Sequence, residues 1–170
     1  MRPSGVDERL GAGPIAAAVA RLALDKARAV AASQPNGVVL GADTVVVIDD
    51  DPLGKPTDAA DARRMLERLR GRAHEVITGI AVVDAATGRS AATSVRSRVL
   101  MADYDAQAIE TYVASGEPFD KAGGYAIQGF GGGLVAGLVG SYSNVVGLPL
   151  AETAALLGSF GVPLKPEVLP

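Results

Sequence analysis

The sequence predicts an α/β protein, because segments with helical spacing and segments with strand character follow one another along the chain. The clearest strand is 38–48, where β-branched residues dominate and Asp43 and Thr44 interrupt an otherwise apolar run. The clearest helix lies within 11–33, where apolar residues recur every three or four positions. A chain of 170 residues is long enough for one domain with a sizeable core, and such a domain can have two lobes.

The composition excludes several kinds of chemistry and favours a soluble protein. There is no cysteine, which excludes disulfides, thiolate zinc sites and a thiol nucleophile. Neither a leader-like segment nor an apolar run long enough to span a bilayer occurs, so we expect a cytoplasmic protein without a membrane partner. The formal net charge of −3 argues against general attraction to nucleic acid. An anionic ligand would therefore need locally placed lysines, arginines or a divalent cation.

Two charged residues on the first predicted elements are candidates for chemistry. Lys26 follows Leu22 by four positions on the apolar stripe of the first helix, so its ammonium either extends to solvent or reaches into a cleft. Asp43 lies within a buried strand, where a carboxylate must be neutralised, hydrogen-bonded or bound to a metal. The alternative is that Asp43 and Thr44 only mark a strand edge or a bulge.

The rest of the chain predicts further short elements joined by turns. We expect helices over 57–71 and 105–115, strands over 74–83, 94–101 and 134–139, and a last helix that begins at 147. The acidic run 49–51 lacks the spacing of a calcium-binding loop, which favours a solvated turn. Lys55 precedes a proline and is held in extended backbone, which makes it a candidate anion contact. The only histidine, His74, is interpreted as structural.

The stretch 117–133 is the least regular part of the sequence. It mixes charged, aromatic and glycine residues, and three glycines in a row follow Phe130. Loops of this composition can bring backbone amides close to a ligand, although a glycine-rich turn alone is a weak signal.

Several short motifs occur in order along nearly the whole chain. They are Val6-Asp7-Glu8, Leu24-Asp25-Lys26-Ala27, Gly41-Ala42-Asp43-Thr44-Val45-Val46, Gly54-Lys55-Pro56, Gly71-Arg72-Ala73-His74-Glu75-Val76-Ile77-Thr78-Gly79, Asp120-Lys121-Ala122-Gly123-Gly124-Tyr125-Ala126-Ile127-Gln128-Gly129 and Gly140-Ser141-Tyr142-Ser143-Asn144-Val145-Val146-Gly147-Leu148-Pro149. Together they closely resemble the Maf family of nucleoside triphosphate pyrophosphatases. The segment 121–129 resembles the branch that acts on dTTP and UTP rather than the branch associated with 7-methyl-GTP.

The resemblance implies a fold, an activity and a cofactor. The fold is an elongated mixed β-sheet flanked by helices, with two lobes around a cleft. The activity is a nucleoside triphosphate diphosphatase that converts dTTP and UTP to the monophosphate and pyrophosphate with a divalent cation, Mg²⁺ or Mn²⁺. A homodimer is expected from the resemblance alone.

The resemblance also assigns roles to individual residues. Asp43 would accept the proton of the attacking water or lie beside the metal, and Glu8 would be a second acidic group that helps hold the metal. Substrate contacts are carried over to Lys26, Lys55, Thr44, Gln128 and Lys121. Among these, the two lysines Lys26 and Lys55 would hold phosphates, while Thr44 and Gln128 would face the base. The alternative for Gln128 is that it only braces the glycine-rich loop.

One departure from the family concerns the beginning of the chain. The family starts with a strand and a Ser-x-Ser-Pro-Arg-Arg loop, whereas residues 1–170 correspond to a single Maf-like domain that is N-terminally truncated. Either the start of the sequence was placed downstream of the real one, or the truncation is natural and impairs the chemistry. Because each lost donor to the transition state costs about 3 to 4 kcal/mol, we expect these residues by themselves to be poorly active and prone to associate. The rival hypothesis is a catalytically impaired nucleotide-binding or division-linked regulatory protein. A nucleic-acid-binding module is a third and weaker hypothesis, because the basic residues are scattered.

Overall fold

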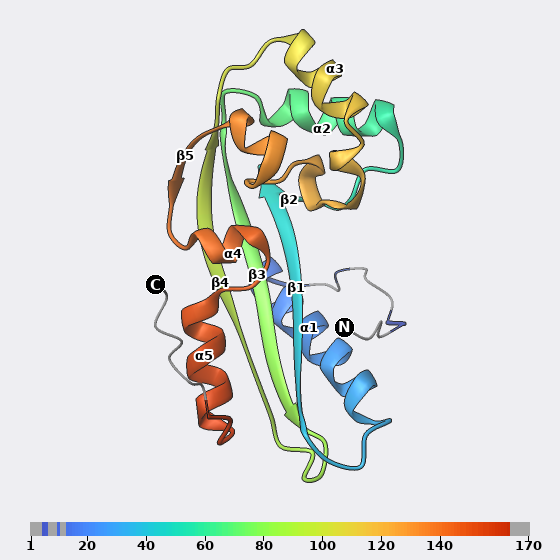
Figure 1. Ribbon diagram of the computed structural model, residues 1–170, viewed down its shortest axis with the longest axis vertical. Coiled ribbons are helices and arrows are strands. Elements are labelled where there is room, and N and C mark those ends of the chain that lie inside the picture. The colour runs from blue at the N-terminus through green and yellow to red at the C-terminus, as the bar shows by residue number, and fades with distance from the viewer. Residues whose placement is uncertain (1–4, 7–9, 11–12, 164–170) are drawn as a thin grey trace. The chain divides into compact units, whose positions relative to one another are not determined.

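The structure, a computed structural model, describes residues 5–6, 10 and 13–163 (Figure 1). Its helices are α1 (Ile15–Ala31), α2 (Ala59–Leu69), α3 (Ala106–Ala114), α4 (Tyr142–Val146) and α5 (Leu150–Ser159). Its strands are β1 (Val38–Ile48), β2 (Asp51–Leu53), β3 (Ala73–Asp84), β4 (Ser90–Met101) and β5 (Val135–Val139). Three short 3₁₀ helices follow α3, namely η1 (Glu117–Asp120), η2 (Ala122–Gly124) and η3 (Gly129–Leu134). None of the helices in this described part of the chain is both long and apolar enough to cross a bilayer.

The five strands form one sheet in the order β2-β1-β3-β4-β5, which confirms the α/β class expected from the sequence. The pairs β1–β2 and β4–β5 are antiparallel, and neighbouring strands run in opposite directions throughout Figure 1. The sheet is thus antiparallel, where the family resemblance implied a mixed one. The reason is that β3 begins beside the end of β1, where Arg72 contacts Asp49, so that β3 runs back along β1.

The chain divides into two compact units. Unit 1 contains the described residues up to Asp43, together with 79–95 and 148–163, and unit 2 contains 44–78 and 96–147. The long strands β1, β3 and β4 each contribute residues to both units. A single domain with two lobes around a cleft stays a prediction.

In unit 1, helix α1 packs directly on the strands through small residues. A Cβ atom added to Gly41 would lie 2.3 Å from the carbonyl oxygen of Ala23, and one added to Gly79 would lie 2.4 Å from that of Val19. The interface is a cluster of small buried side chains, namely Ala23, Ala27, Ala31, Ala81 and Val83. The backbone of α1 can therefore approach the sheet closely only because Gly41 and Gly79 carry no side chain.

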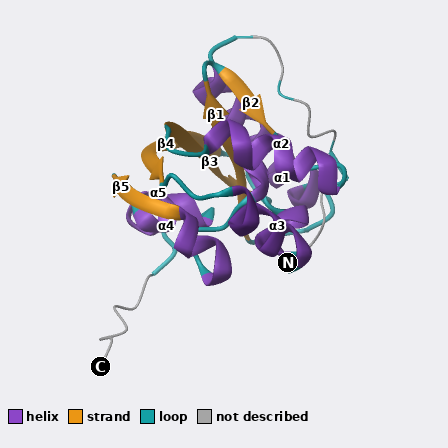
Figure 2. Cartoon of the chain, turned by 90° about the horizontal axis from the view of Figure 1, so that it is seen from above, coloured by secondary structure: helices purple, strands orange, loops and turns teal. Residues whose placement is uncertain are grey.

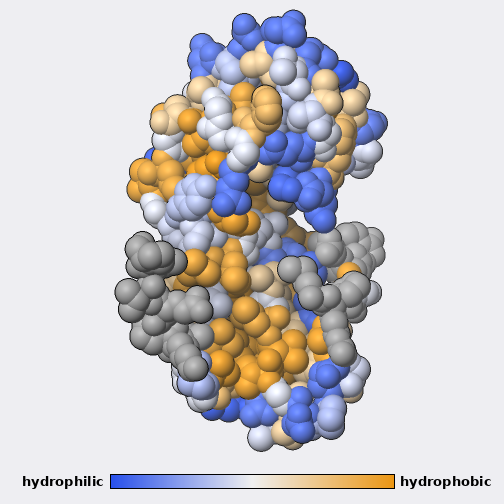
Figure 3. Space-filling model, viewed as in Figure 1, coloured by the Kyte–Doolittle hydropathy of each residue, from blue (hydrophilic) through white to orange (hydrophobic). Residues whose placement is uncertain are grey.

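The other face of β1 in unit 1 is partly open. Side chains alternate along a strand, so Val38 and Leu40 point away from the face that Gly41 presents to α1. They are 37% and 36% exposed. Figure 3 shows apolar side chains gathered in the lower part of the view, where Figure 1 shows α5 and the unit 1 ends of the strands. This side of unit 1 therefore presents apolar surface to solvent.

In unit 2, helices α2 and α3 lie side by side (Figure 2). Each begins at an aspartate whose carboxylate accepts a backbone N–H of the first turn, Asp58 for α2 at 2.7 Å and Asp105 for α3 at 2.8 Å. Tyr104, which precedes α3, donates a 2.7 Å hydrogen bond to the carbonyl of Leu66 in α2. Apolar residues of both helices and of β1, β3 and β4 form the main core of this unit.

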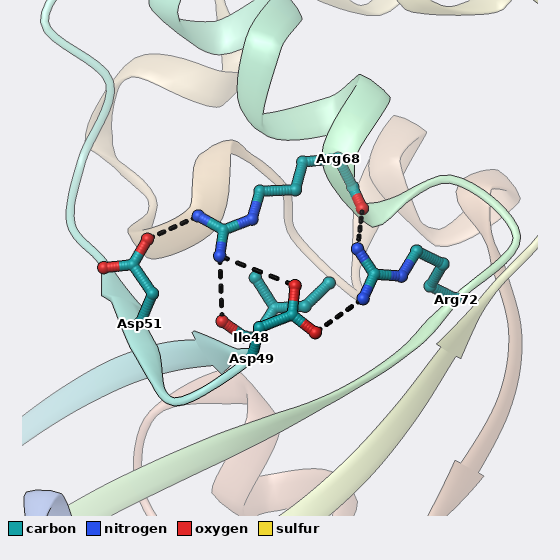
Figure 4. A network of polar contacts seen from close by, with 5 residues as sticks. All are labelled: Ile48, Asp49, Asp51, Arg68 and Arg72. Atoms are coloured by element: carbon teal, nitrogen blue, oxygen red, sulfur yellow. Dashed lines mark hydrogen bonds and ion pairs between the residues drawn. The ribbon is translucent and has the colours of Figure 1, made fainter.

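The acidic turn between β1 and β2 is paired with arginines rather than simply solvated (Figure 4). The Arg72 guanidinium donates a 2.6 Å hydrogen bond to Asp49, and Arg68 of α2 forms ion pairs with Asp49 and Asp51. The hydrogen bond from Arg72 is the main reason that the pKa of Asp49 lies below its ordinary value. These contacts attach the hairpin turn to the end of α2.

Candidate active site

Lys26 and Asp43 form a half-buried ion pair in unit 1. The Nζ atom of Lys26 in α1 lies 2.6 Å from Oδ1 of Asp43 in β1, and each side chain is only 17% exposed. Close packing of α1 over Gly41 puts the helix within reach of the strand. The Asp43 carboxylate is therefore charge-compensated, as the sequence required, and it lies within β1 rather than at its edge.

Thr44 belongs to a polar network in unit 2. Because side chains alternate along a strand, Thr44 leaves β1 on the face opposite to Asp43. Its hydroxyl lies 2.9 Å from that of Thr78, which in turn donates a 3.0 Å hydrogen bond to the carbonyl of Asn144. The fully buried Asn144 amide donates to a β3 carbonyl and to a β4 serine hydroxyl, both at 3.0 Å. The structure thus shows a structural role for Thr44, and its contact with a base stays a prediction.

Lys55 and Lys121 lie on two segments that the fold of unit 2 brings together. The N–H of Gly123 donates a 2.9 Å hydrogen bond to the carbonyl of Gly54, the neighbour of Lys55. Gly123 has a φ of 70°, and a Cβ added there would lie 2.9 Å from the Val46 side chain, so this approach requires glycine. Lys55 is exposed.

Gln128 lies in a loop that is held on both sides. Before it, the Tyr112 hydroxyl accepts the N–H of Ala126 at 3.1 Å. After it, the Glu117 carboxylate accepts the N–H groups of Phe130 at 3.2 Å and of Gly131 at 3.5 Å. Gln128 itself is exposed. An anchored loop with an exposed carboxamide at its tip can present that carboxamide to a ligand with little loss of conformational entropy.

His74 is buried and has a partner that the sequence did not suggest. Its Nε2 atom lies 2.7 Å from the hydroxyl of Tyr125, and the two rings pack edge to face with centroids 5.3 Å apart. Burial lowers the pKa of His74 to about 4, so the imidazole is neutral at pH 7. His74 therefore joins β3 to the loop that carries Gln128, in agreement with the structural interpretation.

The described residues do not form a metal site by themselves. Among residues 5–6, 10 and 13–163, no three aspartate, glutamate or histidine side chains are grouped so that they could hold a cation. Asp43, an expected metal ligand, lies against the Lys26 ammonium. Glu8, the other expected ligand, lies outside the described residues.

Three residues with contacts near the candidate site were missed by sequence reasoning: Tyr112, Glu117 and Asp120. The sequence predicts no partner for Tyr112 or Glu117, and it includes Asp120 only as the first residue of a family motif. Each acts through a side chain that meets a loop backbone or a lysine, and such contacts follow no sequence period.

Comparison with known proteins decides the family. Residues 1–160 match the family described as Maf-like protein. The chain belongs to the Maf family. Its relatives include the dTTP/UTP pyrophosphatase of Moorella thermoacetica, which is 52% identical over 163 residues, covering 95% of this chain and 84% of the relative.

Two further relatives of this Maf chain carry the same name. The dTTP/UTP pyrophosphatase of Anaeromyxobacter sp. (strain Fw109-5) is 52% identical over 169 residues, covering 96% of this chain and 80% of the relative. That of Myxococcus xanthus is 52% identical over 161 residues, covering 94% of this chain and 80% of the relative. The recognition of the Maf family from its motifs is thereby confirmed.

Proposed function

We propose that this chain is a nucleoside triphosphate pyrophosphatase that hydrolyses dTTP and UTP to the monophosphate and pyrophosphate. Membership of the Maf family and the names of its relatives support the reaction class. The observation that carries the proposal is the pair formed by Asp43 and Lys26, a carboxylate and an ammonium 2.6 Å apart and mostly shielded from solvent.

Such a pair suits the attack of water on the α-phosphorus. The ammonium stabilises the ionised form of Asp43, which can then accept a proton from the attacking water. The new bond joins the water oxygen to the α-phosphorus, and the bond from the α-phosphorus to the bridging oxygen breaks so that pyrophosphate leaves. The chemical demand on the protein is mainly positioning and neutralisation of phosphate charge, which lysines can supply.

The remaining residues are proposed as substrate contacts. Lys26, Lys55 and Lys121 bear the positive charge that phosphate oxygens require. Gln128 can both donate to and accept from the edge of a pyrimidine, since a carboxamide carries both kinds of group. Its exposed position in an anchored loop supports this role. Thr44 is proposed to contact the base, in addition to the contact of its hydroxyl with Thr78.

Further expectations accompany the proposal. Family resemblance predicts that activity requires Mg²⁺ or Mn²⁺, with Glu8 among the ligands, and loss of turnover after chelation with recovery on adding the ion would support this. A homodimer is predicted, and a monomeric mass in light scattering would contradict it. A cytoplasmic location stays a prediction from the sequence.

The decisive experiment follows the fate of the water oxygen. The protein is incubated with dTTP or UTP and Mg²⁺ in ¹⁸O-labelled water. The products are separated, and the ¹⁸O content of each is measured by mass spectrometry. Attack at the α-phosphorus puts the label in dTMP or UMP and none in pyrophosphate. Release of orthophosphate and a nucleoside diphosphate, or label in pyrophosphate, would overturn the proposal.

A matched pair of variants tests the carrying observation. In an otherwise active form of the protein, Asp43→Asn should abolish turnover of dTTP and UTP while the protein stays folded, because the amide cannot accept the proton. Asp50→Asn makes the same change in the exposed β1–β2 turn and should leave turnover unchanged. Undiminished turnover by Asp43→Asn would remove that residue from the mechanism. Nucleotide binding without pyrophosphate release by the parent protein would favour the rival hypothesis of a regulatory nucleotide-binding protein.

A further inference from the structure

A carboxylate is paired with one of the two lysines that lie on neighbouring segments of unit 2. Asp120 ends η1 and forms an ion pair with the ammonium of the next residue, Lys121. The Asp120 side chain is 75% exposed and that of Lys121 is 39% exposed. Lys55 belongs to the same neighbourhood, because the backbone of Gly54 accepts a hydrogen bond from Gly123, two residues after Lys121.

Both lysines act on the charge of Asp120. Its pKa lies below the ordinary value, chiefly because of the hydrogen bond from Lys121, and the charge of Lys55 contributes in the same direction. Asp120 is therefore ionised at neutral pH and partly compensates the Lys121 ammonium. A carboxylate paired with a lysine makes the contact that a phosphate oxygen would make in its place.

We propose that Asp120 is an internal counter-ion of a phosphate site formed by Lys55 and Lys121, and that a bound phosphate group displaces it. This inference rests on the proposed function, because it assigns these lysines to a phosphorylated ligand. The displaced carboxylate is close to the surface, so it can turn into solvent without burial of its charge. Binding then exchanges one anion for another and leaves the lysines compensated in both states.

The exchange sets the affinity for phosphate. A phosphate must compete with the carboxylate, so removal of the carboxylate charge should strengthen phosphate binding. Since exposed ion pairs are weak, the expected gain is modest, about three- to five-fold. It should shrink as ionic strength rises, because salt screens exposed charges.

The test uses inorganic pyrophosphate as the probe, titrated into the protein by calorimetry in a buffer with Mg²⁺. Asp120→Asn should bind pyrophosphate more tightly than the parent, and Asp120→Glu, which retains the charge, should bind as the parent does. Asp103→Asn makes the same charge change elsewhere in unit 2, at a side chain that is 91% exposed, and should leave the affinity unchanged. The gain from Asp120→Asn should vanish in a Lys121→Met background.

The outcomes separate this inference from the proposed function. Pyrophosphate binding with the predicted pattern but without dTTP turnover would contradict the proposed pyrophosphatase activity. It would still support the role of Asp120 as a counter-ion. Weaker binding by Asp120→Asn would overturn the inference and would indicate that Asp120 holds the cation or the loop. An equal gain from Asp103→Asn, or a gain that persists in Lys121→Met, would overturn it as well, because the effect would then come from net charge.

Discussion

Gly41 of β1 lies directly against the carbonyl oxygen of Ala23 in α1, so closely that a Cβ on Gly41 would be 2.3 Å from it. Lys26 follows Ala23 by three residues in α1, and Asp43 follows Gly41 by two residues in β1. The side chains of Lys26 and Asp43 form a hydrogen bond. The absence of one side chain therefore determines whether a helix and a strand can form the ion pair between them.

We predict that Gly41→Ala moves α1 away from the strand and lengthens the contact between Lys26 and Asp43. Overpacking of this kind typically costs about 1 to 3 kcal/mol of unfolding free energy. Urea denaturation measures the loss, and turnover of dTTP should fall with it. The control is Gly158→Ala in α5 of the same unit, where a Cβ meets nothing within 4 Å. This control should gain about 0.5 to 1 kcal/mol, because alanine is the better helix former. Equal free energies of unfolding for Gly41→Ala and the parent would show that α1 can move away from the strand without loss of stability.

The Glu117 carboxylate is predicted to hold the Gln128 loop. Glu117→Ala removes the acceptor of two backbone N–H groups at Phe130 and Gly131, which frees the loop after Gln128. The expected result is a several-fold higher KM for UTP with a small change in kcat, together with a lower ratio of UTP to GTP turnover. Steady-state kinetics measure both quantities.

Two other variants decide how this result is interpreted. Glu67→Ala removes an exposed carboxylate from α2 and should change neither KM nor the ratio. Gln128→Ala should lower the same ratio if the carboxamide contacts the base. If the ratio stays constant in Gln128→Ala, Gln128 only braces the loop, and the specificity expected from the sequence is wrong.

His74 predicts how stability depends on pH. In the folded protein its pKa is about 4, whereas an exposed histidine has a pKa of about 6.5, so the unfolded chain binds a proton between these values and the folded protein does not. The contribution of His74 to the free energy of unfolding should therefore be fully present above pH 6.5. It should decrease as the pH falls towards 4, by about 3 kcal/mol in total. Denaturation at pH 7, 6 and 5 measures the slope.

The contribution of His74 to that slope can be isolated by substitution. His74→Gln cannot take up the proton and should have a flatter dependence on pH between 6.5 and 4. Tyr125→Phe removes the hydroxyl that lies 2.7 Å from Nε2 but leaves the imidazole buried, so its steep dependence should persist. A parent and a His74→Gln variant with the same slope would contradict burial as the cause of the lowered pKa.

The stability contributed by the arginine-paired turn should be lost at a lower pH than the contribution of His74. The pKa of Asp49 is lowered, chiefly by the hydrogen bond from Arg72, so the stability that this carboxylate contributes is present above its ordinary pKa of about 3.8. That contribution is lost as the pH falls further, through the lowered pKa of the folded protein. Asp49→Asn should therefore melt at a lower temperature than the parent at pH 6, and the difference should diminish at about pH 3. A difference that stays constant with pH would show that the carboxylate charge is not its source.

Sequence alone determined much of the local structure and the family. Strand 38–48 was predicted with the bounds that β1 has, because a long β-branched run has few alternatives. The helices α1 and α3 lie within their predicted ranges. The short elements β2 and α4 were not predicted, since three to five residues carry too little periodicity to be recognised. Motifs in order along the chain were sufficient for the Maf family.

Only the tertiary structure decided which polar groups meet. Lys26 had two possible directions in the sequence, and the close approach of α1 at Gly41 selected Asp43. The partnership of His74 with Tyr125 and the hydrogen bond of Gly123 to Gly54, which joins the segments of Lys121 and Lys55, were likewise absent from any local pattern. Secondary structure follows from the nearest few residues, whereas the contacts that compensate a charge depend on packing between segments far apart in the chain. For this reason the candidate residues could be named from the sequence, but their partners could not.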